Sequence, residues 1–306
     1  MQSYDRDLTD IFAVQGDIAE RVAAALKVKL LSKEKDALDQ KPTGSPESYS
    51  LYLKGRYFWN ERTREGVKKA IRYFEEAVRL DPNFALAYSG LTDRYLIEED
   101  RGWASHSKAG PLTRGYAEKA LELNADLAEA HASLGLALDE QWDLTGAEKE
   151  LKRVIALKPN YATAYHWYSN VLGGMGRYEE AVEFEKRALE LDPYSSIFGQ
   201  GIGIHLLLMG RTREAIAQFE KTLEIDPGFA SVYIWKAWAN ERVGNFDQAI
   251  EDAEKAAKTQ ENVGLGKLNL ASIYAWAGKE SGLSNCLRKS NPTLQETTSH
   301  RHLSAW

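Results

Sequence analysis

The sequence predicts an all-α solenoid made of antiparallel pairs of helices. Pro159, Pro193 and Pro227 stand 34 residues apart, and each ends a similar amphipathic stretch. In the clearest stretch, residues 177–193, apolar side chains recur at helical spacing and Pro193 stops the helix. The charged residues of that stretch, Glu185 among them, are assigned to its solvent face. A fixed period of this length indicates a repeat array, in which each unit packs on its neighbours.

The N-terminal region precedes the periodic part. Residues 1–35 contain an amphipathic helix over residues 8–31, which does not match the 34-residue pattern. Two interpretations stay open: the helix caps the array, or it is the remnant of an upstream domain. Residues 36–47 follow, and their two prolines, glycine and small polar residues predict a linker.

The periodic region covers residues 48–290 and divides into about seven helix pairs. The second unit is longer than the others, because the step from Pro82 to Ala125 is 43 residues rather than 34. Its extra residues fall in an insertion at 101–114. The last unit is degenerate, as terminal units of arrays commonly are. The final residues, 291–306, lack periodicity and are predicted to form a tail. The units span residues 48–83, 84–125, 126–159, 160–193, 194–227, 228–261 and 262–290.

The sequence of these units resembles the tetratricopeptide repeat. In that family the first helix carries a large residue, then Leu, then a small residue, then Tyr or Leu at fixed spacing. The third and fourth units fill these positions with His131, Leu134, Gly135 and Leu138, and with Tyr165, Tyr168, Ser169 and Leu172. A small residue recurs in the second helices, where the two helices cross closely: Ala147, Ala181, Ala215 and Ala249. The resemblance implies a right-handed superhelix whose first helices line a concave groove for an extended peptide or a partner helix.

A narrower resemblance covers residues 4–30 and 46–95. These stretches, YDRDLTDIFAVQGDIAERVAAALKVKL and PESYSLYLKGRYFWNERTREGVKKAIRYFEEAVRLDPNFALAYSGLTDRY, look like a junction found in bacterial signalling proteins. In that group a TolB-like or FlgO-like α/β domain precedes a tetratricopeptide array. A winged-helix DNA-binding domain, an adenylate cyclase or a protein kinase lies further upstream. The resemblance implies that the chain is the C-terminal half of such a protein or a free-standing paralogue.

Composition argues against several classes of protein. A net charge of −6 does not suit a general nucleic-acid binder, which needs a concentrated basic face. The single cysteine, Cys286, allows no intramolecular disulfide framework. No run of about 18 apolar residues predicts a membrane span, and the polar N-terminus does not read as a signal peptide. We expect a cytoplasmic chain, or a periplasmic one if it is the C-terminal part of a membrane-anchored protein.

The sequence holds no recognisable catalytic or cofactor-binding constellation. None of the six histidines forms a metal-ligand pair with a supporting carboxylate. Gly199, Gly201 and Gly203 faintly resemble a dinucleotide-binding loop, but the register places them inside a helix. Close packing or a locally soft fifth unit is the expected reason for them there. The glycines in residues 173–176 are expected at an inter-helix turn. We therefore predict no enzyme activity, no cofactor and no metal site.

Binding is predicted on the first helices of the units. By the repeat register, residues one, five, eight and nine positions beyond the large-residue position point into the groove. Aromatic and arginine side chains there are the types that commonly anchor partners. An alternative stays open, in which the tryptophans pack between neighbouring units instead. The predicted groove residues are Tyr52, Arg56, Trp59, Asp93, His166, Asn170, Gln200, Trp238, Glu241, Arg242 and Trp276.

The predicted function is that of a protein–protein interaction scaffold within a bacterial signalling or transcription-regulatory system. Two other functions stay open. One is a small-molecule sensor that uses the groove near Trp238 and His166. The other is an accessory region of a multidomain adenylate cyclase, kinase or winged-helix regulator whose output domain lies outside this chain. The expected partners are proteins or peptides rather than nucleic acid, and the chain itself is not expected to insert into a membrane.

Overall fold

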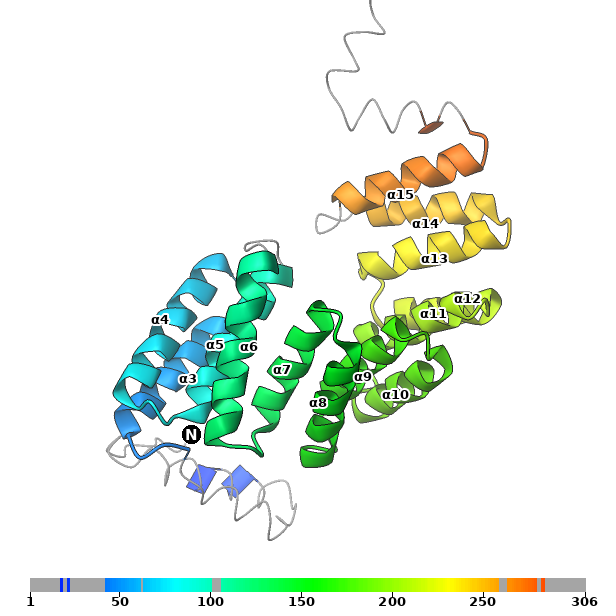
Figure 1. Ribbon diagram of the computed structural model, residues 1–306. Coiled ribbons are helices and arrows are strands. Elements are labelled where there is room, and N and C mark those ends of the chain that lie inside the picture. The colour runs from blue at the N-terminus through cyan, green and yellow to red at the C-terminus, as the bar shows by residue number, and fades with distance from the viewer. Residues whose placement is uncertain are drawn as a thin grey trace, which may run out of the picture. The chain divides into compact units, whose positions relative to one another are not determined.

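The structure is a computed structural model that describes residues 17–18, 21–22, 42–61, 63–100, 106–258, 263–279 and 282–283, without the side chains of residues 64, 93–100, 106–112 and 263–268. Within these ranges the chain forms helices joined by turns, and it contains no strand. It divides into two compact units, Met1–Lys158 and Pro159–Trp306. The predicted fold class, an all-α array of antiparallel helix pairs, is confirmed (Figure 1).

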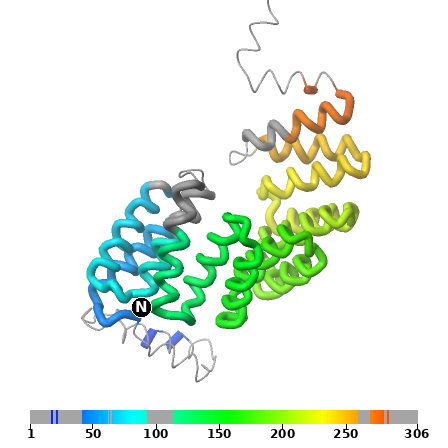
Figure 2. The backbone as a smooth tube through the Cα atoms, viewed as in Figure 1, coloured from blue at the N-terminus to red at the C-terminus, as the bar shows by residue number. Residues whose placement is uncertain are grey.

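Within each unit, consecutive helices pack as pairs and each pair packs on the next (Figure 2). The first unit contains the pairs α3 with α4, α5 with α6, and α7 with α8. Their bounds are α3 Pro46–Asn60, α4 Arg64–Leu80, α5 Ala85–Asp100, α6 His106–Leu123, α7 Ala128–Glu140 and α8 Leu144–Leu157. The second unit pairs α9 with α10, α11 with α12, and α13 with α14, and α15 follows. Their bounds are α9 Ala162–Gly174, α10 Tyr178–Leu191, α11 Ser196–Leu208, α12 Thr212–Ile225, α13 Ala230–Arg242, α14 Phe246–Lys258 and α15 Val263–Trp276.

Local sequence sets where the helices begin and end. The side chains of Ser45, Thr63 and Asp143 each accept a hydrogen bond from a backbone N–H in the first turn of the helix that follows. At the other end, α4, α8, α10 and α12 each stop two residues before a proline, which cannot continue a helix. The prolines that predicted the period therefore mark real helix ends.

A residue with positive φ follows the first helix of several pairs. The backbone N–H after it bonds to a carbonyl five residues earlier, as from Arg177 to Leu172 at 2.9 Å. The equivalent residue between α7 and α8 is Trp142, which has a φ of 60° and is 79% exposed. A bulky side chain in this region costs about 1–2 kcal/mol. In four other turns the position is glycine, with φ between 65° and 79°: Gly176, Gly210, Gly244 and Gly278.

Small residues let neighbouring helices approach closely. The alanines that the repeat pattern placed at the helix crossings are all fully buried: Ala147, Ala181, Ala215 and Ala249. Glycine also allows a close approach on α11, where a Cβ on Gly203 would collide with the ring of Phe219 on α12. Close packing, one of the two reasons expected for the glycines of α11, is thus confirmed.

Two sequence-based assignments are wrong. Gly173 and Gly174 belong to α9 rather than to a turn, and Gly173 lies against the ring of His205. Glu185 is fully buried rather than exposed on the solvent face of α10. The insertion in the second unit also proves to be partly regular, because its residues 106–114 form the first half of α6.

Several predictions fall outside the described residues. They include most of the N-terminal helix, the linker up to residue 41, Cys286 and the tail at 291–306. Of the predicted seventh pair, the structure describes α15 and two helical residues, 282–283. The domain boundaries at both ends therefore stay predictions.

Candidate functional site

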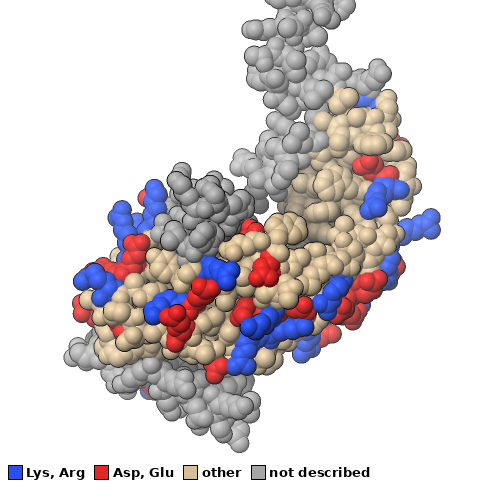
Figure 3. All heavy atoms as spheres, in the orientation of Figure 1, with Lys and Arg blue, Asp and Glu red and all other residues tan. Residues whose placement is uncertain are grey.

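The first helices of the second unit, α9, α11 and α13, lie next to one another. Because the repeats are equivalent, residues at the same position in successive units form rows across these helices. Asn170, Ile204 and Trp238 share one position, and Leu208 and Arg242 share another. We call the side of the three helices that carries these five residues the first-helix face. Figure 3 shows mostly uncharged surface over α11 and α13, with charged side chains gathered toward α10 and α12.

The first-helix face exposes large apolar side chains. Leu208 is 48% exposed and Trp238 is 38% exposed. The ring of Trp238 meets that of Trp235 edge-on, with 4.9 Å between their centroids. Trp235 in turn packs on the buried core formed by α11 and α12. The core therefore supports Trp235, and Trp235 supports an exposed ring of the kind that anchors protein partners.

Polar side chains on these helices are held by the neighbouring helix. Nε2 of Gln200 donates to Oγ of Ser231 at 2.5 Å, which joins α11 to α13. Nη1 of Arg242 donates to the carbonyl of Leu207 at 3.3 Å, and its other N–H groups have no partner among the described residues. Beside it, partial burial raises the pKa of Glu241. The face thus combines an apolar anchor with preoriented hydrogen-bonding groups.

His166 links the first-helix face to the interior. Its Nδ1 lies 2.7 Å from Oε1 of Glu185 on α10, and its Nε2 lies 3.2 Å from Nδ2 of Asn170. When the carboxylate is ionised it can only accept, so Nδ1 is then the donor, and this contact orients the ring. Burial raises the pKa of Glu185, and the hydrogen bond from His166 opposes that rise.

The burial of Glu185 follows from its repeat position. The residues 34 positions apart from it in the other units are Leu151, Phe219 and Ala253, and all three are fully buried. Sequence reasoning missed this signal, because it considered the helical face of one stretch alone and not the register of the array.

His205 on α11 is a second buried ionisable residue, with 4% exposure. Its Nε2 lies 3.0 Å from Oγ of Ser169, whose hydroxyl donates to the carbonyl of Ala181 at 2.9 Å. Nε2 is therefore the donor to that oxygen. Burial lowers the pKa of His205 to about 4, and the nearby His166 adds to the effect. Nδ1 of His205 and Oε2 of Glu185 have no hydrogen-bond partner in the described part of the chain.

A third buried polar group holds α13 on α14. Nζ of Lys236 lies 3.4 Å from Oδ1 of Asp252, and Nδ2 of Asn240 donates to Oδ2 at 3.0 Å. Asp252 is fully buried; burial raises its pKa, and the charge of Lys236 opposes that rise. Removing one partner of such a buried pair commonly costs about 3–5 kcal/mol. The helix that carries Trp238 is therefore firmly placed.

The predicted groove residues of the first unit belong largely to its core. Tyr52 packs against Phe74 and Phe84, with ring centroids 5.8 Å and 5.4 Å away. Trp59 is half-buried in the same region, and the guanidinium of Arg56 lies 4.6 Å from its ring centroid. For Trp59, packing between helices is thus the observed arrangement.

Two predicted residues stand apart from the others. The side chain of Asp93 on α5 lies outside the described residues. Trp276 on α15 is 73% exposed. The structure therefore groups the predicted residues of α9, α11 and α13 on adjoining helices, whereas the residues of α3 belong to the other unit.

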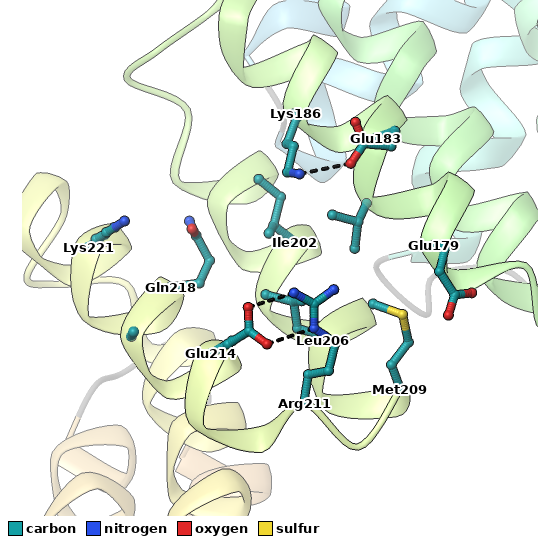
Figure 4. A pocket seen from close by; sticks show the side chains of 12 residues that line it. Glu179, Glu183, Lys186, Ile202, Leu206, Met209, Arg211, Glu214, Gln218 and Lys221 are labelled. Carbon is teal, nitrogen blue, oxygen red and sulfur yellow. Dashed lines mark hydrogen bonds and ion pairs between the residues drawn. The ribbon is translucent and has the colours of Figure 1, made fainter.

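Sequence reasoning missed a pocket between the second helices of this unit. A cavity of about 400 Å³ lies between α10 and α12, and side chains of α10 and α11 form its floor (Figure 4). It depends on the sizes of particular side chains, which the period of the sequence does not encode. The residues that line it are Glu179, Val182, Glu183, Lys186, Ile202, Leu206, Met209, Arg211, Glu214, Ala217, Gln218 and Lys221.

No three His, Cys, Asp or Glu side chains of the described ranges come together in a way that could hold a metal ion. None of the helices described has both the length and the apolar character needed to cross a bilayer.

Comparison with known families identifies two stretches of the chain. Residues 162–195 and 201–262 match two family models, each described as tetratricopeptide repeat. These residues are tetratricopeptide repeats. A tetratricopeptide repeat protein from Parabacteroides merdae has the same fold, with a TM-score of 0.58 and 16% identity over 80% of this chain and 92% of that chain. Such arrays typically act as protein-binding scaffolds rather than as catalysts.

Two bacterial proteins are similar to part of the chain. One is putative adenylate cyclase 3 of Rhizobium meliloti, 30% identical over 149 residues, which are 48% of this chain and 25% of that protein. The other is transcriptional regulator HilA of Salmonella typhimurium, 26% identical over 155 residues, which are 51% of this chain and 28% of that protein. The chain thus matches only about a quarter of the length of these relatives.

Proposed function

We propose that the chain binds a peptide or a segment of a partner protein on the first-helix face of its second unit. The observation that carries the proposal is the exposed ring of Trp238, supported by Trp235 and neighboured by Arg242. The ring offers apolar contact area, and the guanidinium offers hydrogen bonds to a peptide carbonyl or carboxylate. Because the supporting helices are already packed, little ordering entropy opposes binding.

We further propose that this binding serves bacterial signalling or transcription regulation. The names of the relatives from Rhizobium meliloti and Salmonella typhimurium, an adenylate cyclase and a transcriptional regulator, support this context. In this proposal the array is the docking part, and the output activity belongs to another domain or another protein.

Site-specific photocrosslinking tests where the partner binds. A photoreactive phenylalanine replaces Trp238 in one variant and Tyr194 in another, because Tyr194 is 83% exposed in the turn before α11, outside the first-helix face. In lysate of the source organism, the label at position 238 should give discrete protein adducts that the label at position 194 does not give. Equal adducts at both positions would count against the proposed face.

The double variant Trp238→Ala and Arg242→Ala tests the contribution of the two side chains. Loss of two anchors should lower the affinity for the captured protein about tenfold or more. Circular dichroism should show unchanged helicity. If helicity collapses instead, these residues support the fold and the assignment of the face is wrong.

A further inference from the structure

The pocket between α10 and α12 has no part in the first-helix face. Its volume of about 400 Å³ lies in the range that proteins use for ligands. Val182, Ile202 and Leu206 form an apolar floor, and Met209 and Ala217 extend it. We call this pocket the second-helix slot.

Most of the charges around the second-helix slot neutralise one another. Nζ of Lys186 lies 2.8 Å from Oε1 of Glu183 on α10. The guanidinium of Arg211 binds both carboxylate oxygens of Glu214, at 2.7 Å and 2.6 Å. Figure 4 shows both pairs beside the slot. Because each of these charges already has a partner, neither pair needs a ligand to compensate its charge.

Three other side chains of the slot have no hydrogen bond or ion pair among the described residues. Gln218 and Lys221 lie close together at one end of the slot, and Glu179 lies at the other end (Figure 4). One end therefore offers N–H donors and a positive charge, and the other offers a carboxylate. Along α10 the lining runs from Glu179 to Lys186, which corresponds to about 10 Å or two helical turns.

We propose that the second-helix slot binds an amphipathic helix of a partner protein, with aliphatic residues between one acidic and one basic residue two turns apart. The acidic residue pairs with Lys221 and Gln218, the basic residue pairs with Glu179, and the aliphatic side chains cover the floor. A ligand with a single charged end, such as a fatty acid, leaves Glu179 unmatched. Glu179 is near enough to Arg211 to feel its charge, but it forms no hydrogen bond or ion pair in the described part of the chain. The opposite charges of Glu179 and Lys221 therefore favour a peptide that carries both an acidic and a basic residue. Since the floor side chains are already nearly buried, the apolar gain is small and the complex is weak and readily exchanged.

Three helical probe peptides with the same alanine and leucine core test this charge pattern. One carries Glu and Lys two turns apart, one carries Lys at both places, and one carries Glu at both places. In ligand-observed NMR titrations with the full chain, the mixed peptide should bind about 2- to 5-fold more tightly than the other two. Lys221→Glu should transfer the preference to the peptide with two lysines. Glu179→Lys should transfer it to the peptide with two glutamates.

Two variants in which phenylalanine replaces an alanine test where the peptide binds. Ala217→Phe fills the slot and should abolish binding of all three peptides. Ala156→Phe, at an exposed alanine on α8, is the matched control and should leave binding unchanged. Trp238→Ala should also leave it unchanged, which separates this slot from the first-helix face. The proposal is overturned if no peptide binds the wild-type chain, if neither charge variant changes the preference, or if Ala217→Phe has no effect.

Discussion

Individual residues of the second unit place ionisable groups where other repeats carry apolar ones. His205 occupies the position of Ala137, Val171 and Ala239, which are all buried. Glu185 likewise stands where its counterparts are hydrophobic. Burial of such groups costs free energy unless hydrogen bonds replace those made to water. Each of the two has one acceptor atom without a partner in the described structure, so the replacement is only partial.

His205 should make the stability of the second unit depend on pH. Burial lowers its pKa from 6.5 to about 4 in the folded chain. Between these values the unfolded chain binds a proton that the folded chain does not bind. Stability from this residue is therefore complete above pH 6.5 and is lost as the pH falls toward 4. The full loss is about 3 kcal/mol.

Urea denaturation from pH 7 to about pH 4, on the wild type and His205→Gln, measures this loss. The glutamine keeps a donor for Ser169 but does not titrate. Other ionisable groups titrate in both proteins, so their effects cancel in the difference between the two. The stability of the wild type relative to the variant should therefore fall with pH, because only the wild type carries His205. A constant difference would contradict a buried neutral imidazole.

Trp142 stores backbone strain in the turn between α7 and α8. Trp142→Gly should raise the free energy of unfolding by about 1 kcal/mol, because glycine adopts positive φ freely and the exposed indole has little packing to lose. Urea denaturation gives the change. The matched variant is Gly176→Ala, at the equivalent turn, where a Cβ meets no atom within 4 Å. Gly176→Ala should lower the free energy of unfolding by a similar amount. If Trp142→Gly is destabilised instead, the indole makes packing contacts that outweigh the backbone strain.

The glycines of helix α11 decide how closely it lies to its neighbours. Gly201 faces the carboxylate of Glu185 on α10, and Gly203 faces Phe219 on α12. Each glycine costs the helix about 1 kcal/mol relative to alanine. Better packing on both sides must offset this cost, so α11 depends on tertiary contacts more than on its own helical propensity.

Gly201→Ala should therefore lower the stability of the second unit by about 1–3 kcal/mol, although alanine is the better helix former. The matched variant is Gly115→Ala on α6, where the added Cβ meets no atom within 4 Å. This second change should raise stability by about 0.5–1 kcal/mol. Thermal denaturation of the wild type and both variants measures the two changes in stability. If both variants are stabilised, α11 is packed more loosely than the structure indicates.

Across the entire array, the features that recur every 34 residues were predictable. Prolines and small residues act locally, so their spacing was enough to predict the helix pairs and the buried alanines. Glu185 was misplaced because its burial is visible only in register with residues such as Leu151 and Phe219. The second-helix slot and the bond from Arg242 to the carbonyl of Leu207 depend on contacts between different helices, which the period of the sequence does not encode.

The pairing of Glu185 with Gly201 also has a consequence for the order of the repeats. Helices that are alike in sequence can dock on the wrong neighbour, and such misassembly is a characteristic failure of repeat proteins. The residues that correspond to Gly201 are Trp167 on α9 and Trp235 on α13. An indole at that place would occupy the space of the Glu185 carboxylate. On the side of α10 that carries Glu185, the pair therefore favours α11 over α13. We expect this preference to disfavour packing in which one unit is skipped.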